Sequence, residues 1–166
     1  NPVLGEGNHN ADVLFIGEAP GKKEDELGRP FVGSAGKFLD ELIESMGWKR
    51  SDVYISNVVK YRPPDNRDPT PEEKAECMPW LMLEIAIIKP KVIVPLGRHS
   101  LGHFFDKLSI SDAHGHPQPL TDDVTIFPIY HPAAAMHNGG LRQALHDDFA
   151  QLKIFLDSQG IAPPTE

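Results

Sequence analysis

The chain has 166 residues, which is enough for one domain with a three-layer core, and its 40% hydrophobic and 24% charged residues are typical of a soluble protein. No apolar run approaches the roughly 20 residues of a membrane-spanning helix, and the net charge of −8 disfavours nucleic acid as a partner unless positive charge is clustered locally. Cys77 is the single cysteine, which excludes an internal disulfide and fits a reducing compartment. We therefore expect a cytoplasmic protein with no membrane partner.

The first predicted element after an N-terminal arm (residues 1–10) is a short buried strand, Val13–Ile16. The glycines and proline of Gly17–Gly21 cannot extend a sheet, so the chain turns there. Glu18 therefore stands at the carboxyl end of a buried strand, which is where open α/β sheets bind ligands. A turn glutamate paired with Lys22 or Lys23 is the alternative.

The next elements alternate between helix and strand. Apolar residues at helical spacing, among them Phe38 and Leu42, predict one helix. The strand that follows this helix ends at Asn57. The predictions up to residue 67 are a polar loop at 24–33 carrying Phe31, a helix at 34–46 with Ser34 as N-cap and Gly47 as its stop, a strand at 53–56 ending on Asn57, and a loop at 57–67.

The second half of the chain continues this alternation. Thr70 and Glu73 form a capping box with Pro71 at the first helical position. The predicted elements are a helix to about Lys89 buried along Ala75, Met78, Leu81, Met82, Ile85 and Ile88, a strand at 92–96, a short helix with Leu101, a loop or hairpin at 109–123, a strand at 125–130 ending at His131, a helix at 140–158 and a frayed tail at 159–166.

This order predicts a single α/β domain over residues 1–166, a three-layer α/β/α sandwich with a short, mainly parallel four-stranded central sheet. Right-handed crossovers bring all strand carboxyl ends to one edge. Three strands end there in Glu18, Asn57 and His131. The loops with Phe31 and with residues 60–67 reach the same edge, so we expect one site.

Four motifs give the chain a resemblance to a known family. They are Gly17-Glu-Ala-Pro-Gly-Lys-Lys-Glu-Asp25, Gly28-Arg-Pro-Phe-Val-Gly33, Asn57-Val-Val-Lys-Tyr-Arg-Pro-Pro64 and His131-Pro-Ala133. In this order and spacing they resemble the uracil-DNA glycosylase superfamily, in particular its family four of bacteria and archaea. The resemblance covers roughly residues 5 to 155 and implies a DNA repair enzyme that flips uracil out of DNA and hydrolyses its glycosidic bond.

The resemblance implies roles for six residues. Glu18 and His131 would be the catalytic pair, Asn57 the base reader, Phe31 the stacking ring, Glu24 a pocket wall, and Ala19 the pocket residue where many relatives carry Asp or Asn. Asn57 can accept from uracil N3–H and donate to O4, a pattern that cytosine reverses. His131 could stabilise the departing uracil anion, and Glu18 the sugar cation or the attacking water.

Taken alone, these residues also allow structural explanations. Phe31 could be a core ring under a loop, Asn57 a cap or turn residue, and His131 a cap of its own turn. Two other functions stay open: an inactive uracil-DNA-binding relative, or a nucleotide- or phosphate-binding module with Gly17–Gly21 as an anion cradle. The glutamate at the centre of that turn weakens the last alternative.

The family's iron–sulfur cluster is expected to be absent. It needs four cysteines, two of which precede this chain's first residue; Tyr61 replaces the third and Cys77 matches the fourth. No other metal is expected, because His114 and His116 are the only close histidine pair and lack a completing carboxylate. The loop after Asn57 also lacks the insertion of the related DNA-crosslinking branch, which favours ordinary turnover.

We expect a monomer that binds uracil-containing DNA through a local basic rim on an acidic protein. The predicted DNA-binding side chains comprise three in the loop after Asn57, two after His131 and one on the last helix: Lys60, Arg62, Arg67, Met136, His137 and Arg142. Met136 and His137 could enter the gap that the flipped base leaves.

Overall fold

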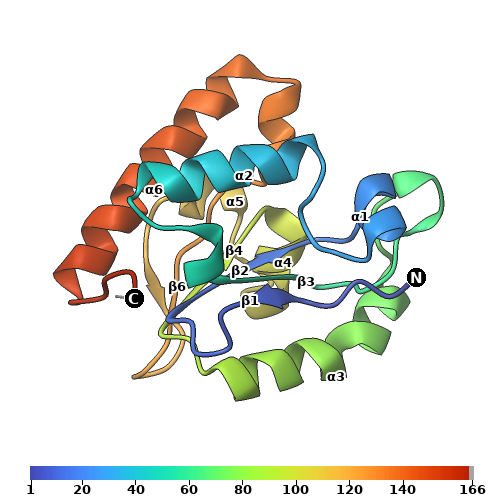
Figure 1. Cartoon of the computed structure of the whole chain (residues 1–166), viewed down its shortest axis with the longest axis horizontal. Helices are drawn as coiled ribbons and strands as arrows, with labels where there is room; N and C mark the ends of the chain where they lie inside the picture. The colour runs from blue at the N-terminus through green and yellow to red at the C-terminus, as the bar shows by residue number, and fades with distance from the viewer. Residues whose placement is uncertain (165–166) are drawn as a thin grey trace.

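The computed structural model describes residues 1–164 and confirms the three-layer α/β architecture (Figure 1). Its sheet has the strand order β1-β3-β2-β4-β6-β5. The four central strands are parallel, as predicted, and a two-residue antiparallel strand is added at each edge. The strands are β1 (Glu6–Gly7), β2 (Val13–Gly17), β3 (Tyr54–Asn57), β4 (Val92–Pro95), β5 (Gln118–Pro119) and β6 (Thr125–Ile126).

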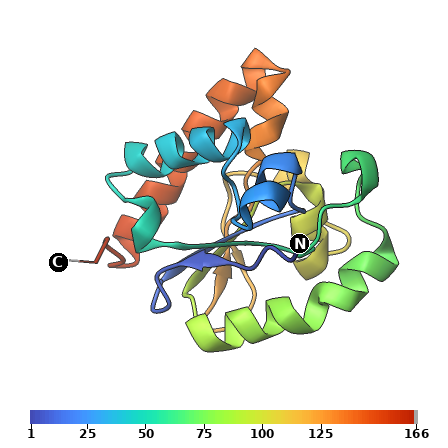
Figure 2. The same ribbon diagram turned by 45° about the vertical axis from the view of Figure 1, so that its right-hand side comes forward.

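Helices cover both faces of the sheet. In both views α2 and α6 lie together on one face, and α3 runs along the other (Figures 1 and 2). None of the helices within residues 1–164 is long and apolar enough to cross a membrane. The helices are α1 (Lys22–Leu27), α2 (Ser34–Ser45), α3 (Pro71–Ile88), α4 (Arg98–Phe104), α5 (Ile110–Ala113) and α6 (Gly139–Ser158), with 3-10 turns η1 (Arg50–Asp52), η2 (Pro64–Asn66) and η3 (Pro132–Met136).

Strand β2 is the centre of the core, because its side chains alternate between the two layers. Phe15 belongs to the cluster on the side of α2 and α6, and its ring stacks on Phe149 of α6 at 5.9 Å. Leu14 and Ile16 belong to the cluster on the side of α3, together with Leu81. All these side chains are fully buried, so neither face of the central strand meets water.

Helix starts were predicted with mixed success. The capping box is confirmed: Thr70 Oγ1 accepts from Glu73 N at 3.2 Å, and Glu73 Oε1 accepts from Thr70 N at 2.8 Å. Ser34 is not an N-cap, because it already lies inside α2 and Gly33 takes the cap position. Part of the predicted polar loop belongs to helix α1. The helix begins after its N-cap residue, Gly21, whose N–H donates to Glu24 Oε1 and so stabilises the first turn.

The predicted buried stripe of α3 is confirmed in half of its positions: Leu81 and Ile88 are buried, and the partly buried Ile85 packs against the same core cluster. Ala75, Met78 and Met82 face solvent instead, and Cys77, which the prediction left out, is buried. The helix is rotated because Glu84, a charged residue that an apolar stripe leaves out, points to the sheet and accepts from Ser56 and Gly5. An apolar pattern alone could not show that a carboxylate belongs to this face.

Three segments carry more structure than the sequence analysis gave them. In the N-terminal arm Val3 is buried, and its N–H donates to Lys60 O at 2.7 Å. Residues 109–123, predicted as a loop or hairpin, contain helix α5 and strand β5, and β5 pairs antiparallel with β6 as in a hairpin. In the expected frayed tail Ile161 is buried in the core, and residues 165–166 lie outside the described part.

Lys60 is buried, which corrects its prediction as a DNA contact. Its ammonium forms an ion pair with Glu84 and donates to Ser56 Oγ at 2.6 Å and to Asn57 O at 2.7 Å. Burial lowers the pKa of Lys60, and the Glu84 carboxylate opposes this shift. With 2% of the side chain exposed, Lys60 cannot reach a phosphate; it ties α3 to the end of β3 instead.

Removing the carboxylate of this pair should destabilise the fold. Glu84→Leu leaves the Lys60 ammonium buried and unpaired, which costs about 3–5 kcal/mol in the free energy of unfolding, measured by urea denaturation. Adding Lys60→Met should recover part of that loss because the unpaired charge is gone. Asp157→Leu, in the exposed Lys153–Asp157 pair, is the control and should change stability by less than about 1 kcal/mol. This account would be contradicted if the loss of unfolding free energy in the double variant equalled the sum of the losses in Glu84→Leu and Lys60→Met alone.

Candidate active site

One cavity of about 440 Å³ lies at the carboxyl edge of the sheet. Glu18, Phe31, Asn57 and His131 all line it, so the predicted convergence of these four side chains is confirmed. The volume falls in the range of small-molecule sites. Further lining residues from the predicted set are Ala19, Glu24 and Arg67.

The parallel register of β2 and β3 brings Glu18 and Asn57 together. Gly17 stands opposite Asn57, the last pair of the ladder. Pairing continues beyond it, since Val58 N donates to Gly17 O and Val59 N donates to Glu18 O, both at 3.0 Å. Both strands therefore end at the same level, and the side chains of Asn57 and Glu18 open into one cavity.

Gly17 is required by close packing. A Cβ atom at this position would overlap the ring of Phe31 and the side-chain oxygen of Asn57. The absent side chain is what lets the aromatic ring and the amide approach the strand end from two sides.

The side chain of Asn57 holds an unpaired polar atom. Asn57 is 3% exposed, and its Oδ1 has no hydrogen-bond partner within residues 1–164. Its backbone is fixed from behind by Lys60 Nζ. Buried acceptors are normally satisfied, so an orphan acceptor in a cavity points to a ligand that donates a hydrogen bond.

His131 is held as a neutral donor. Its Nδ1 accepts from Ala133 N at 3.0 Å, and burial lowers its pKa to about 4. At neutral pH the ring therefore carries its proton on Nε2. The ring lies against that of Phe31, with centroids 5.5 Å apart and planes 27° apart.

Glu18 is half-buried, and its pKa is raised to about 7 by burial and then by the neighbouring Asp68. His99 Nε2 lies 3.9 Å from Glu18 Oε1 and 3.4 Å from Asp68 Oδ2. Two cations border this group: Lys74 Nζ lies 2.9 Å from His99 Nδ1, and Arg98 donates to Asp68 at 3.0 Å. Glu18 is thus poised to exchange a proton near neutral pH.

Asp68 and His99 were missed by the sequence analysis. Asp68 lies just beyond the loop segment that was considered, and His99 follows β4, a fourth strand that ends at this edge. Applying the strand-end rule to β4 would have identified His99. The ligand atoms of Glu18, Asp68 and His99 lie within 4.8 Å of one another, which is close enough to hold a metal ion, and the sequence analysis did not identify this group.

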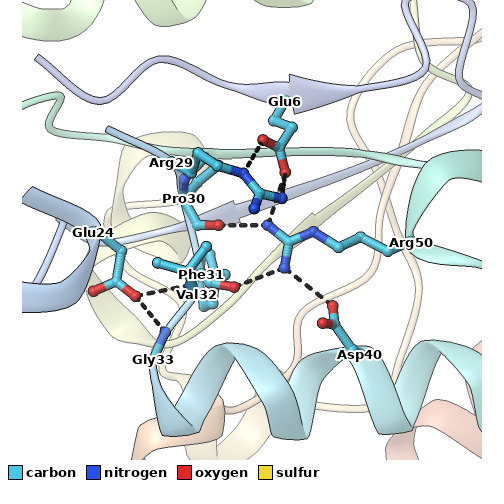
Figure 3. Close-up of polar contacts among 9 residues, drawn as sticks. All are labelled: Glu6, Glu24, Arg29, Pro30, Phe31, Val32, Gly33, Asp40 and Arg50. Atoms are coloured by element: carbon cyan, nitrogen blue, oxygen red, sulfur yellow. Dashed lines mark hydrogen bonds and ion pairs between the residues drawn. The ribbon is translucent and has the colours of Figure 1, made fainter. Parts of the chain in front are cut away.

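Glu24 forms part of the pocket wall, yet its carboxylate is occupied by the backbone. Oε2 accepts from Val32 N and Gly33 N, both at 2.8 Å (Figure 3). Oε1 accepts from Gly21 N at 3.0 Å. Glu24 therefore ties the segment after Phe31 to the turn that carries Glu18.

Of the remaining predicted DNA contacts, Arg67 is the one that lines the cavity. It pairs with Glu73, and Arg62 donates to Asn66 at 2.7 Å. Arg142 stacks on Phe38 of α2, 4.2 Å from the ring centroid. Two further exposed side chains stand on or just after η3: Met136 and His137.

The residues present do not fit an iron–sulfur cluster. Cys77 is buried, and its Sγ accepts from Lys60 N at 3.3 Å. Tyr61, which matches a ligand position, is 54% exposed and offers no thiolate. His114, the other metal candidate, pairs with Asp148 at 2.8 Å.

Comparison with known proteins agrees with this geometry. The chain is 47% identical over 162 residues to the type-4 uracil-DNA glycosylase of Sulfurisphaera tokodaii, covering 92% of this chain and 74% of the relative. It is 46% identical to the type-4 uracil-DNA glycosylase of Saccharolobus solfataricus, covering 97% and 79%. The fold is similar to the crystal structure of Pedobacter heparinus SMUG2, with a TM-score of 0.54, 14% identity, and 89% and 77% of the two chains covered. The family model of the uracil DNA glycosylase superfamily matches residues 4–153, and the chain belongs to this superfamily.

Proposed function

We propose that this protein excises uracil from DNA by flipping the base into the cavity and hydrolysing the bond between uracil N1 and the sugar C1′, which leaves an abasic site. The observation that carries this proposal is the unpaired Oδ1 of Asn57, buried in a cavity that also holds an aromatic face and a neutral histidine donor. Membership of the uracil DNA glycosylase superfamily supports it.

Asn57 is the proposed reader of the base. Its Oδ1 accepts the N3–H of uracil, and its Nδ2 donates to O4. Phe31 stacks on the base, with Ala19 and Glu24 as walls of the same pocket. Cytosine presents an acceptor at N3 and a donor at N4, so it would leave buried groups unpaired on both sides.

His131 and Glu18 are the proposed catalytic residues. Departure of uracil leaves negative charge on the base, and the Nε2–H of neutral His131 donates to uracil O2 as this charge develops. Positive charge develops on the sugar, where the Glu18 carboxylate stabilises it or orients the attacking water. Ala19 has no polar group for either task, so this work falls to Glu18.

DNA binding is proposed along the rim of the cavity. Arg62 and Arg67 would contact phosphates on one side and Arg142 on the other, while Met136 and His137 fill the gap left by the flipped base. The protein is proposed to act on DNA as a monomer in the cytoplasm. We propose that it works without an iron–sulfur cluster, since Tyr61 and Cys77 do not supply the ligands.

Recognition and catalysis should separate in two variants, measured by single-turnover cleavage of matched uracil and cytosine oligonucleotides. Asn57→Asp places an acceptor opposite uracil O4, so it should weaken uracil excision and shift preference toward cytosine. His131→Ala should slow uracil cleavage about 10²- to 10³-fold and leave the preference unchanged, because it removes only an anion-stabilising donor.

His116→Ala is the matched control for the histidine, since it removes an exposed imidazole that does not line the cavity. The wild-type protein must generate alkali-labile sites at uracil. Binding to uracil-DNA without release of the base would show an inactive relative instead. Full uracil activity in Asn57→Asp, with no gain on cytosine, would remove Asn57 as the reader.

The excision rate should depend on the ionisation of Glu18. Because its pKa is raised to about 7, the carboxylate is protonated below that pH and the rate should rise about tenfold per pH unit up to about pH 7, then level off. His131, with a pKa of about 4, stays neutral throughout this range. Asp68→Asn removes a like charge beside Glu18. It should therefore move the break in the profile, the pH at which the rate levels off, to a lower value.

Asp65→Asn is the control, because it removes an exposed carboxylate from the same loop and should leave the break in place. Glu18→Gln should flatten the profile at a low rate. A wild-type rate that is constant from pH 5 to 8, or a break that moves upward in Asp68→Asn, would contradict the assignment of Glu18.

A further inference from the structure

The backbone of Phe31 adopts a conformation that an aromatic residue rarely takes. Its φ is +51°, in the left-handed region. Such a conformation persists only where the surroundings fix it from several sides, and it is found preferentially at functional sites. The groups that fix Phe31 therefore also set the position of the ring in the uracil pocket.

Arg50 fixes this segment from the side away from the cavity. Its Nη1 donates to Phe31 O at 2.6 Å, and its Nη2 donates to Pro30 O (Figure 3). Two consecutive carbonyls are thus held by one planar guanidinium, a geometry that the ammonium of lysine cannot reproduce. Arg50 is not among the residues that line the cavity.

Two carboxylates hold the guanidinium itself. Asp40 of α2 accepts from Nη1 at 3.1 Å, and Glu6 of β1 accepts from Nη2 at 3.3 Å. The Arg50 side chain is 20% exposed, so this pairing is shielded from water. Arg29 also binds Glu6, through its Nε at 2.7 Å, but within residues 1–164 its side chain donates only to Glu6 and not to the Phe31 segment.

The opposite side of the segment is closed as well. Glu24 accepts from the N–H groups of Val32 and Gly33, directly after Phe31. Gly36 of α2 packs so closely on Phe31 O that a Cβ atom there would overlap it. Arg50 is the member of this arrangement that bonds the carbonyl of Phe31 itself without lining the cavity.

We propose that Arg50 is a positioning residue for uracil: it acts on the base only through Phe31, by holding the Pro30 and Phe31 carbonyls so that the ring presents its face to the cavity. This rests on the proposed function. The alternative is that Arg50 only joins β1, η1 and α2, through Glu6 and Asp40, and contributes to stability alone.

A double-mutant cycle distinguishes the two. Arg50→Met removes the donors while keeping an unbranched side chain, and it should lower single-turnover kcat/KM on a uracil oligonucleotide by about 5- to 150-fold, the range of base–aromatic stacking. In a Phe31→Ala background the same substitution should cost less than about twofold, because the ring it positions is gone. Arg29→Met is the matched control and should change kcat/KM less than about twofold in both backgrounds.

A second readout is independent of catalysis. The His131 ring protons lie against the Phe31 ring, so their NMR chemical shifts should change in Arg50→Met and stay unchanged in Arg29→Met. Arg50→Lys keeps the charge beside Glu6 and Asp40 but loses the two-carbonyl fork. It should change both readouts in the same direction, and it serves if Arg50→Met does not fold.

The proposal would be overturned if Arg50→Met lowered kcat/KM equally in the wild-type and Phe31→Ala backgrounds. The same holds for Arg50→Lys where it replaces Arg50→Met. Unchanged His131 chemical shifts would also overturn the proposal. A wild-type protein that does not cleave uracil-DNA would overturn the proposed function instead. In that case the NMR comparison still decides whether Arg50 positions Phe31.

Discussion

The site depends on a steric constraint at Gly17, where there is no room for a side chain. Here the central strand ends in register with Asn57, and any side chain would overlap both the Phe31 ring and the Asn57 amide. Three segments distant in sequence meet at this one position. The strand pairing fixes the amide, the bare backbone admits the ring, and the next residue, Glu18, faces the same cavity.

Two cations hold the pocket residues from the side away from the cavity, Lys60 fully buried and Arg50 partly buried. Lys60 donates to the carbonyl of Asn57 and Arg50 to the carbonyl of Phe31, and each cation is paired with carboxylates from other elements. Such pairs are seldom net sources of stability, but breaking one is costly, so they favour a single geometry. Two features cost free energy: the positive φ of Phe31 and the unpaired buried acceptor of Asn57. Both therefore lie at the cavity, where a ligand would contact these residues.

Much of this architecture could be predicted from local signals. Apolar strands bounded by Gly and Pro turns gave the parallel sheet, and the strand-end rule brought Glu18, Asn57 and His131 to one cavity. Lys60 was misassigned because a lysine beside a motif looks like a phosphate contact, and only the tertiary structure shows Glu84 opposite it. Half of the predicted stripe of α3 was misplaced for the same reason. His99 could have been found from the end of β4. Asp68 belongs to a loop without periodicity, and only the tertiary structure shows that it lies beside Glu18 and His99.

The most direct measurement is a crystal structure of the protein with uracil, the product of the proposed reaction. The account predicts the base stacked on Phe31, its N3–H and O4 bonded to the Asn57 amide, and its O2 within hydrogen-bond distance of His131 Nε2. Uracil bound outside this cavity, or bound within it with Asn57 Oδ1 still unpaired, would contradict the account.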